Sequence, residues 1–144
     1  MAYSGKFSPK NVHKYLGDPT NIWYRSLWER RVMVHLDGNP SVVEWSNEEI
    51  VIPYLSPVDN RWHRYFPDFF VRTRARNGLL EALILEVKPK KQSVPPTPKK
   101  RITKQYINEV MTWGVNEAKW KAADEYCKDR NWKFRVITEE DLGI

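Results

Sequence analysis

The sequence predicts one α/β domain with a central mixed sheet flanked by helices, and two observations lead to this class. A stretch with the apolar spacing of a helix, Thr103 to Asp129, stands between two strand-like stretches, as in a right-handed crossover between parallel strands. Strand-like stretches also flank Asn77-Gly78, a dipeptide typical of hairpin turns. The 144 residues suit a single domain, 1–144, with one core.

The first elements are a basic segment and a helix. Residues 1–21 show no regular pattern and carry several lysines, which is compatible with a basic N-terminal arm that lies on a partner or with a solvated tail. A helix is predicted from Trp23 to Asp37, ended by Gly38 and Pro40. Its apolar stripe recurs every four residues at Trp28, Val32 and Leu36.

Strands are predicted next, over Val42 to Trp45, Ile50 to Tyr54, Tyr65 to Arg74 and Leu79 to Lys88. The last of these is nearly all apolar around Glu86, which indicates a central strand covered on both faces. Residues 89–98 hold four prolines and several lysines, so an exposed basic loop without regular structure is expected.

The long helix is predicted to bury one face, marked by Ile107, Val110, Met111, Gly114, Val115, Ala118 and Ala122. A strand is predicted from Trp132 to Ile137, where apolar residues alternate. A final helical turn is expected over Thr138 to Asp141, because acidic residues favour the start of a helix.

Composition narrows the function classes. The net charge of +6 and pI of about 9.4 favour a polyanionic partner: nucleic acid first, with an acidic membrane or an acidic protein as alternatives. No apolar stretch reaches the roughly 20 residues needed to cross a bilayer, and no signal peptide is expected at the polar N-terminus. The single Cys127 excludes an internal disulfide, and the scattered histidines do not have zinc-site spacing.

The strongest chemical signal is a pair of carboxylates on neighbouring apolar strands. Asp68 lies between Phe66 and Phe69, and Glu86 lies inside the apolar run that ends at Val87. Such carboxylates repel each other, and a divalent cation between them removes this penalty. Lys88 shares a strand face with Glu86, so carboxylate, metal and ammonium together suit phosphodiester hydrolysis. The alternative is an ion pair that only stabilises the sheet.

The hairpin register tests this hypothesis. A two-residue turn at Asn77-Gly78 would pair Asp68 with Val87 and put the two carboxylates on opposite faces of the sheet. The predicted site therefore requires a shift of one residue, through a three-residue loop or a bulge in the hairpin.

These residues resemble a known nuclease family. Pro67-Asp68 followed by Glu86-Val87-Lys88 is similar to the PD-(D/E)xK nuclease signature, and Tyr24 to Glu29 resembles the first helix of the Tn7-type transposon endonuclease A subunit. Resemblance to the head completion nucleases of T4-like tailed phages extends over nearly the whole chain. It is carried by Met1 to Lys6, Gly17 to Pro19, Val51 to Tyr54, Lys88 to Lys91 and Trp113 to Ala122.

The resemblance implies a restriction-endonuclease-like fold and Mg²⁺-dependent cleavage of double-stranded DNA, with Mn²⁺ as an alternative ion. It implies that Asp68, Glu86, the Val87 carbonyl and Glu29 bind the metal, and that Lys88 is the catalytic lysine. For Glu29 the alternative is a surface ion pair with a neighbouring arginine. It further implies a role in phage head completion, in the cytoplasm of an infected bacterium or in the virion head or neck, with portal or neck proteins as partners.

Other residues are candidates for DNA contact. They are Lys90, Lys91, Lys99, Lys100, Arg101, Arg72 and Gln105. The lysines are expected to grip phosphates. Arg72 belongs to a basic strand face that can equally be a solvated edge, and Gln105 is either a polar site residue or a solvated one.

Two rival functions remain open at this point. One is a non-catalytic head or neck component that binds DNA or the portal, in which the acidic site only stabilises the fold. The other is a repair or transposition nuclease of the same fold. A homo-oligomer, which would help to cut both strands, is compatible with either.

Overall fold

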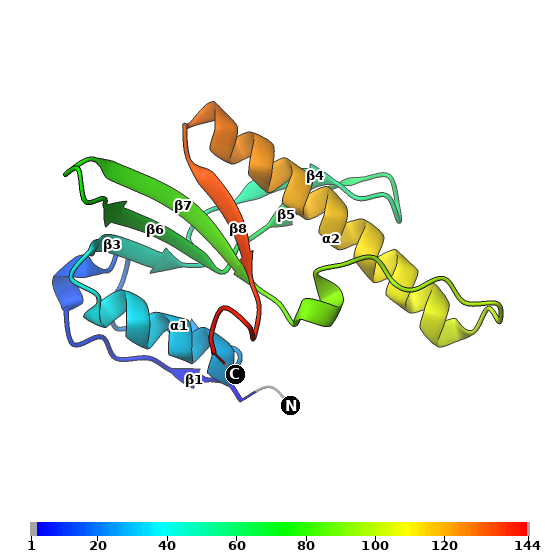
Figure 1. The fold of residues 1–144 in the computed structure, drawn as a ribbon, viewed down its shortest axis with the longest axis horizontal. Coiled ribbons are helices and arrows are strands. Elements are labelled where there is room, and N and C mark those ends of the chain that lie inside the picture. The colour runs from blue at the N-terminus through cyan, green and yellow to red at the C-terminus, as the bar shows by residue number, and fades with distance from the viewer. Residues whose placement is uncertain (1–2, 144) are drawn as a thin grey trace.

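The centre of the molecule is a four-stranded mixed sheet in the order β3, β6, β7, β8 (Figure 1). The computed structural model describes residues 3–143. β3 (Val42–Asn47), β6 (Phe69–Arg74) and β7 (Leu80–Val87) pair antiparallel, and β8 (Lys133–Ile137) runs parallel to β7. The predicted class, the central position of the apolar strand and the parallel return after the long helix are all confirmed.

The two faces of the sheet are covered by different elements. α1 (Leu27–Gly38) packs on the face that presents Phe69, Val71 and Leu85. α2 (Lys104–Asp129) packs on the opposite face, which presents Phe70 and Ile84. Burial on both faces explains why β7 reads as a continuous apolar run. None of the helices within residues 3–143 is long and apolar enough to cross a membrane.

The predicted strand Tyr65 to Arg74 is confirmed over Phe69–Arg74 but wrong at its start, because the chain leaves the preceding strand before Pro67 and bends at Asp68. Its first residue belongs to β5 (Trp62–Tyr65), which forms a separate hairpin with β4 (Ile52–Leu55). Proline has no N–H to donate to a ladder, so it interrupts the strand and starts a new direction at Phe69. This bend places Asp68 at the start of β6.

The N-terminal segment is neither a free arm nor a solvated tail over residues 3–21. β1 (Gly5–Lys6) pairs with β2 (Trp23–Tyr24), and a 3₁₀ turn, η1, spans Val12–Lys14. The buried Lys14 ammonium donates to the backbone oxygens of Asp37 and Asn39, each at 2.9 Å. This cation meets the unpaired carbonyls at the end of α1, where the helix dipole favours it.

α1 begins four residues later than predicted. Trp23 belongs to β2, and Ser26 caps the helix by accepting a hydrogen bond from Glu29 N at 3.2 Å. The end at Gly38 agrees with the prediction. Val32 and Leu36 are buried as expected, together with Met33.

α2 has the predicted limits, but the predicted burial of its first half is wrong. Thr103 caps it by accepting from Tyr106 N, and only its second half packs on the sheet. Ile107, Val110 and Met111 remain 43–45% exposed, because the helix extends past the sheet (Figure 1). The preceding loop is exposed as predicted, yet it contains a 3₁₀ turn, η2 (Lys90–Gln92). Residues 138–143 form hydrogen-bonded turns rather than a helix.

Candidate active site

The β6–β7 hairpin has the three-residue loop that the site requires. Ala75 N donates to Leu79 O at 2.8 Å, which leaves Arg76, Asn77 and Gly78 between the strands. Gly78 takes the left-handed conformation at φ 81°. The ladder pairs Phe69 with Leu85, so one step further Asp68 stands opposite Glu86. The predicted shift of register is therefore confirmed.

Each of the two carboxylates accepts a hydrogen bond from a backbone N–H of the facing strand segment. Asp68 Oδ2 accepts from Val87 N at 2.8 Å, and Glu86 Oε2 accepts from Asp68 N at 3.3 Å. The same Glu86 oxygen accepts from the Tyr65 hydroxyl at 2.7 Å. Both acidic side chains are thus held in fixed positions at the end of the β6–β7 ladder.

Burial makes this pair costly to ionise. It raises the pKa of Asp68 well above its usual value, and the charges of Glu86 and Glu29 raise this pKa further. The hydrogen bond from Val87 N and the charge of Lys88 lower it in part. Burial also raises the pKa of Glu86, opposed by hydrogen bonding from Tyr65 and by Lys88. A divalent cation between the two groups would remove most of this penalty.

Lys88 completes the predicted trio. Its Nζ lies 3.8 Å from Glu86 Oε1, and its side chain is 30% exposed. The ammonium therefore stands between the buried carboxylate and solvent, where a substrate phosphate would approach.

Glu29 reaches the same region from α1. It is buried, and its Oε2 accepts from the backbone N of Arg25 at 3.2 Å. The Arg25 guanidinium instead pairs with Glu48, so the alternative of a surface ion pair for Glu29 is wrong. Burial raises the pKa of Glu29, and Glu48 and Glu86 raise it further. A third acidic group thus contributes to the negative potential around Asp68.

The oxygen atoms present fit a hard divalent cation. Val87 N points to Asp68, and in an extended strand the carbonyl of the same residue points to the same side. Two carboxylates and one carbonyl leave positions for water, as Mg²⁺ prefers. Within residues 3–143 no group of three or more His, Cys, Asp or Glu is arranged to hold a metal, so the carbonyl and water have to complete the shell.

The predicted DNA-contact residues fall into two groups. Lys91, Lys99, Lys100 and Arg101 are exposed on the loop before α2. Lys90 pairs with Glu140 at 2.7 Å and Arg72 with Glu44 at 2.8 Å, so both of these charges are already partnered. Gln105 is exposed at the start of α2 and donates to Glu109 at 3.4 Å.

Sequence reasoning missed two residues beside the carboxylates. Tyr65 donates to Glu86, and Lys119 on α2 lies with its ammonium 5.6 Å from the Tyr65 ring centre and 5.7 Å from that of Tyr54. Burial and then Lys88 lower the pKa of Lys119, whereas Glu86 and Asp68 raise it. A signal for it existed: Lys119 follows Val115 by four residues and therefore lies on the predicted apolar face of the helix.

Two comparisons with known proteins identify the family and a relative of this chain. A family model described as TnsA-like endonuclease N terminal matches residues 39–139. The head completion nuclease of Enterobacteria phage T4 is 42% identical over 146 aligned residues, which cover 99% of this chain and 95% of the relative.

Proposed function

The chain belongs to the TnsA-like endonuclease family, and we propose that it cuts double-stranded DNA at a Mg²⁺ site, or a Mn²⁺ site, formed by Asp68 and Glu86. It is a nuclease with the restriction-endonuclease-like fold expected from the sequence. We further propose that residues 1–144 act as one nuclease domain.

The observation that carries the proposal is the carboxylate pair itself. Asp68 and Glu86 are brought face to face by a register that a commoner two-residue turn would have prevented. Each accepts a hydrogen bond from a backbone N–H, and burial raises the pKa of each even though Lys88 lies beside them. A purely structural pair would gain from the opposite arrangement, with a cation of the chain between the carboxylates.

Each residue of the site has a separate role in the proposed hydrolysis. Asp68, Glu86 and the Val87 carbonyl would hold a divalent cation, which would supply the positive charge that polarises a phosphate and lowers the pKa of a water. The Lys88 ammonium orients the attacking water and offsets charge that builds up on the phosphate oxygens. Tyr65 holds Glu86 in place through its hydroxyl. Glu29 adds negative charge beside Asp68 and would reach the cation through a water molecule rather than directly.

The biological setting follows from the T4 relative. That protein is called a head completion nuclease, and we propose that this chain has the same role, with packaged DNA as substrate and portal or neck proteins as partners. The cytoplasm of the infected cell or the virion head or neck is then its place of action.

DNA cleavage tests the assignment. Supercoiled and linear DNA are incubated with Mg²⁺ or Mn²⁺ and wild-type protein, Asp68→Ala, Lys88→Ala or the control Lys121→Ala, an exposed lysine paired with Glu117. Wild type and control should cut, and each site variant should lose at least about 10²-fold in rate while still binding DNA. If wild type binds DNA but cuts with neither ion, and the variants bind alike, a non-catalytic DNA- or portal-binding component becomes the better description.

A further inference from the structure

One face of α2 carries a continuous row of polar side chains. They follow at intervals of three or four residues, which places them along one side of the helix: Gln105, Asn108, Thr112, Asn116 and Lys119. The row rises about 21 Å along the helix, at about 1.5 Å per residue. It ends at Lys119, beside the carboxylates.

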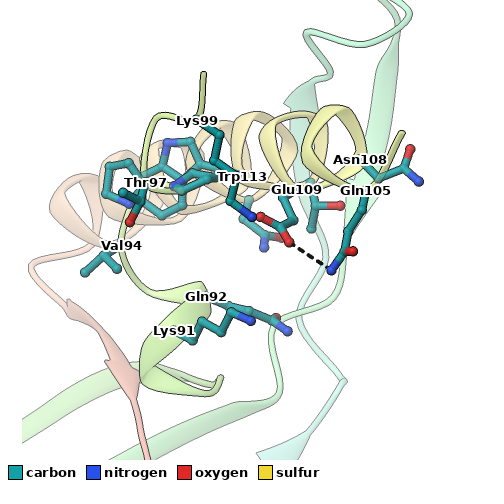
Figure 2. A pocket seen from close by; sticks show the side chains of 13 residues that line it. Lys91, Gln92, Val94, Thr97, Lys99, Gln105, Asn108, Glu109 and Trp113 are labelled. Atoms are coloured by element: carbon teal, nitrogen blue, oxygen red, sulfur yellow. Dashed lines mark hydrogen bonds between the residues drawn. The ribbon is translucent and has the colours of Figure 1, made fainter. Parts of the chain in front are cut away.

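This row forms the floor of two adjacent hollows. The larger, of about 900 Å³, lies between α2 and the basic loop, with Lys91, Lys99 and Trp113 on its walls (Figure 2). The smaller, of about 370 Å³, lies beside Val58 of the β4–β5 turn and reaches Lys119. Both share three floor residues, Asn108, Thr112 and Asn116. The two hollows therefore adjoin along this row, which runs as a path from the basic loop to Lys119.

Two groups along this path lack a partner within residues 3–143. The Asn116 side chain is 7% exposed and forms no hydrogen bond to another described residue. The Lys119 ammonium, which lies over Tyr54 and Tyr65, forms no ion pair with a described carboxylate. An amide and a half-buried ammonium that face a hollow without a protein partner can form hydrogen bonds to a ligand there.

We propose that this face of α2 binds one strand of DNA as it leaves the carboxylate site, with Lys119 on the phosphate next to the cut. The next part of the DNA strand contacts Asn116, Thr112 and Asn108. The end of the strand furthest from the cut contacts Trp113 and the basic loop. The inference rests on the proposed function, because the strand enters from the carboxylate site.

The charges and the length of the path fit a nucleic-acid strand. Its walls carry Lys91 and Lys99, and Glu109 is engaged by Gln105 at 3.4 Å. The remaining floor is neutral amide and hydroxyl, which can donate to phosphate and sugar oxygens. The row, about 21 Å long, can therefore contact several successive nucleotides of one strand.

Binding measured without metal tests the path. Fluorescence anisotropy of a labelled duplex with a single-stranded end is recorded in EDTA over a salt series. The proteins are wild type, Lys119→Met, Lys119→Arg and the control Lys121→Met. Methionine keeps an apolar stem over the tyrosine rings but removes the charge. Lys121 lies on another side of the same helix and pairs with Glu117.

Lys119→Met should bind about tenfold more weakly, because one charge-assisted contact is lost. It should also lower the log–log salt slope by about 0.7–0.9, the value of one phosphate contact. Lys119→Arg and Lys121→Met should both stay close to wild type. Melting temperatures of all four proteins show whether folding is intact.

Two results would overturn the inference. One is an unchanged affinity and slope for Lys119→Met. The other is an equal loss for Lys119→Arg, which would make the contribution of Lys119 one of packing rather than charge. Since no metal is present, failure of the wild type to cut DNA would overturn the proposed function separately and leave this result standing.

Discussion

At the scale of single residues, the site could be predicted where a side chain contradicts its surroundings. Asp68 and Glu86 are carboxylates in apolar strands, and Lys88 is tied to Glu86 by the two-residue period of a strand. Tyr65 could not be found in this way, because a tyrosine in a strand is ordinary until its hydroxyl is seen to donate to Glu86 at 2.7 Å. The chain changes direction between Tyr65 and Phe69, so the direction of the Tyr65 side chain relative to Glu86 is known only from the fold.

Tyr65→Phe should slow cleavage about tenfold, because it removes one hydrogen bond to a charged group. The hydroxyl also lowers the pKa of Glu86, so its loss should move the acidic limb of the pH–rate profile to higher pH. Tyr54→Phe is the matched control, since Tyr54 also lies under Lys119 but donates no hydrogen bond to Glu86. Single-turnover rates between pH 5 and 9 measure both effects. An unshifted profile would contradict the positioning role of Tyr65.

At the scale of elements, local signals predicted most of the fold and failed where tertiary contacts decide. The hairpin, α2 and β8 have strong periodicity and clear caps. The start of α1 was placed too early because Trp23 and Tyr24 continue the helical pattern, although they pair with β1. The first half of α2 carries an apolar pattern that no part of the sheet reaches. Periodicity shows which face of a helix is apolar, but not whether another element covers it.

Gly78→Ala should destabilise the hairpin by about 1–2 kcal/mol, the cost of a left-handed conformation for an ordinary residue. A Cβ at this position would meet nothing within 4 Å, so the effect is conformational rather than steric. Gly78→Asn should cost less, because asparagine tolerates this region better. Urea unfolding of the three proteins measures the difference. Equal losses for alanine and asparagine would show that the φ of residue 78 is not what limits the loop.

At the scale of the whole molecule, a basic surface surrounds an acidic centre. The net charge of +6 attracts DNA over the entire chain, while Glu29, Asp68 and Glu86 concentrate negative charge at one point. Without a metal, this charge weakens the contact of DNA with the carboxylates themselves. Metal binding and substrate binding are therefore expected to reinforce each other.

Metal-free protein should lose stability as the pH rises. The folded pKa values of Asp68, Glu86 and Glu29 lie above their ordinary values of 3.8 and 4.5, so the folded state holds more protons in the range between the ordinary and the raised values. The free energy of unfolding contributed by these groups falls through that range. At pH 7.5, Mg²⁺ at about 100 times its Kd should raise the Tm by about 5–10 °C.

Asp68→Asn isolates this effect from the other carboxylates. The variant keeps an acceptor oxygen for Val87 N but loses the charge, so its Tm should fall less with pH and respond little to Mg²⁺. Thermal unfolding from pH 5 to 8, with and without the ion, compares the two proteins. Parallel curves would exclude Asp68 as the group that links stability to pH and metal.

The hydrogen bonds that Asp68 and Glu86 accept also link the proposed catalytic residues to the stability of the sheet. At this end of β6 and β7 these side chains replace the backbone ladder, so each acid also holds the two strands together. In a lineage that no longer needs cleavage, an amide in place of either carboxylate would remove the charge and keep the acceptor oxygen. Loss of that oxygen would break the hydrogen bond that joins β6 to β7. Inactive descendants of this chain should therefore keep asparagine and glutamine at these two positions more often than alanine.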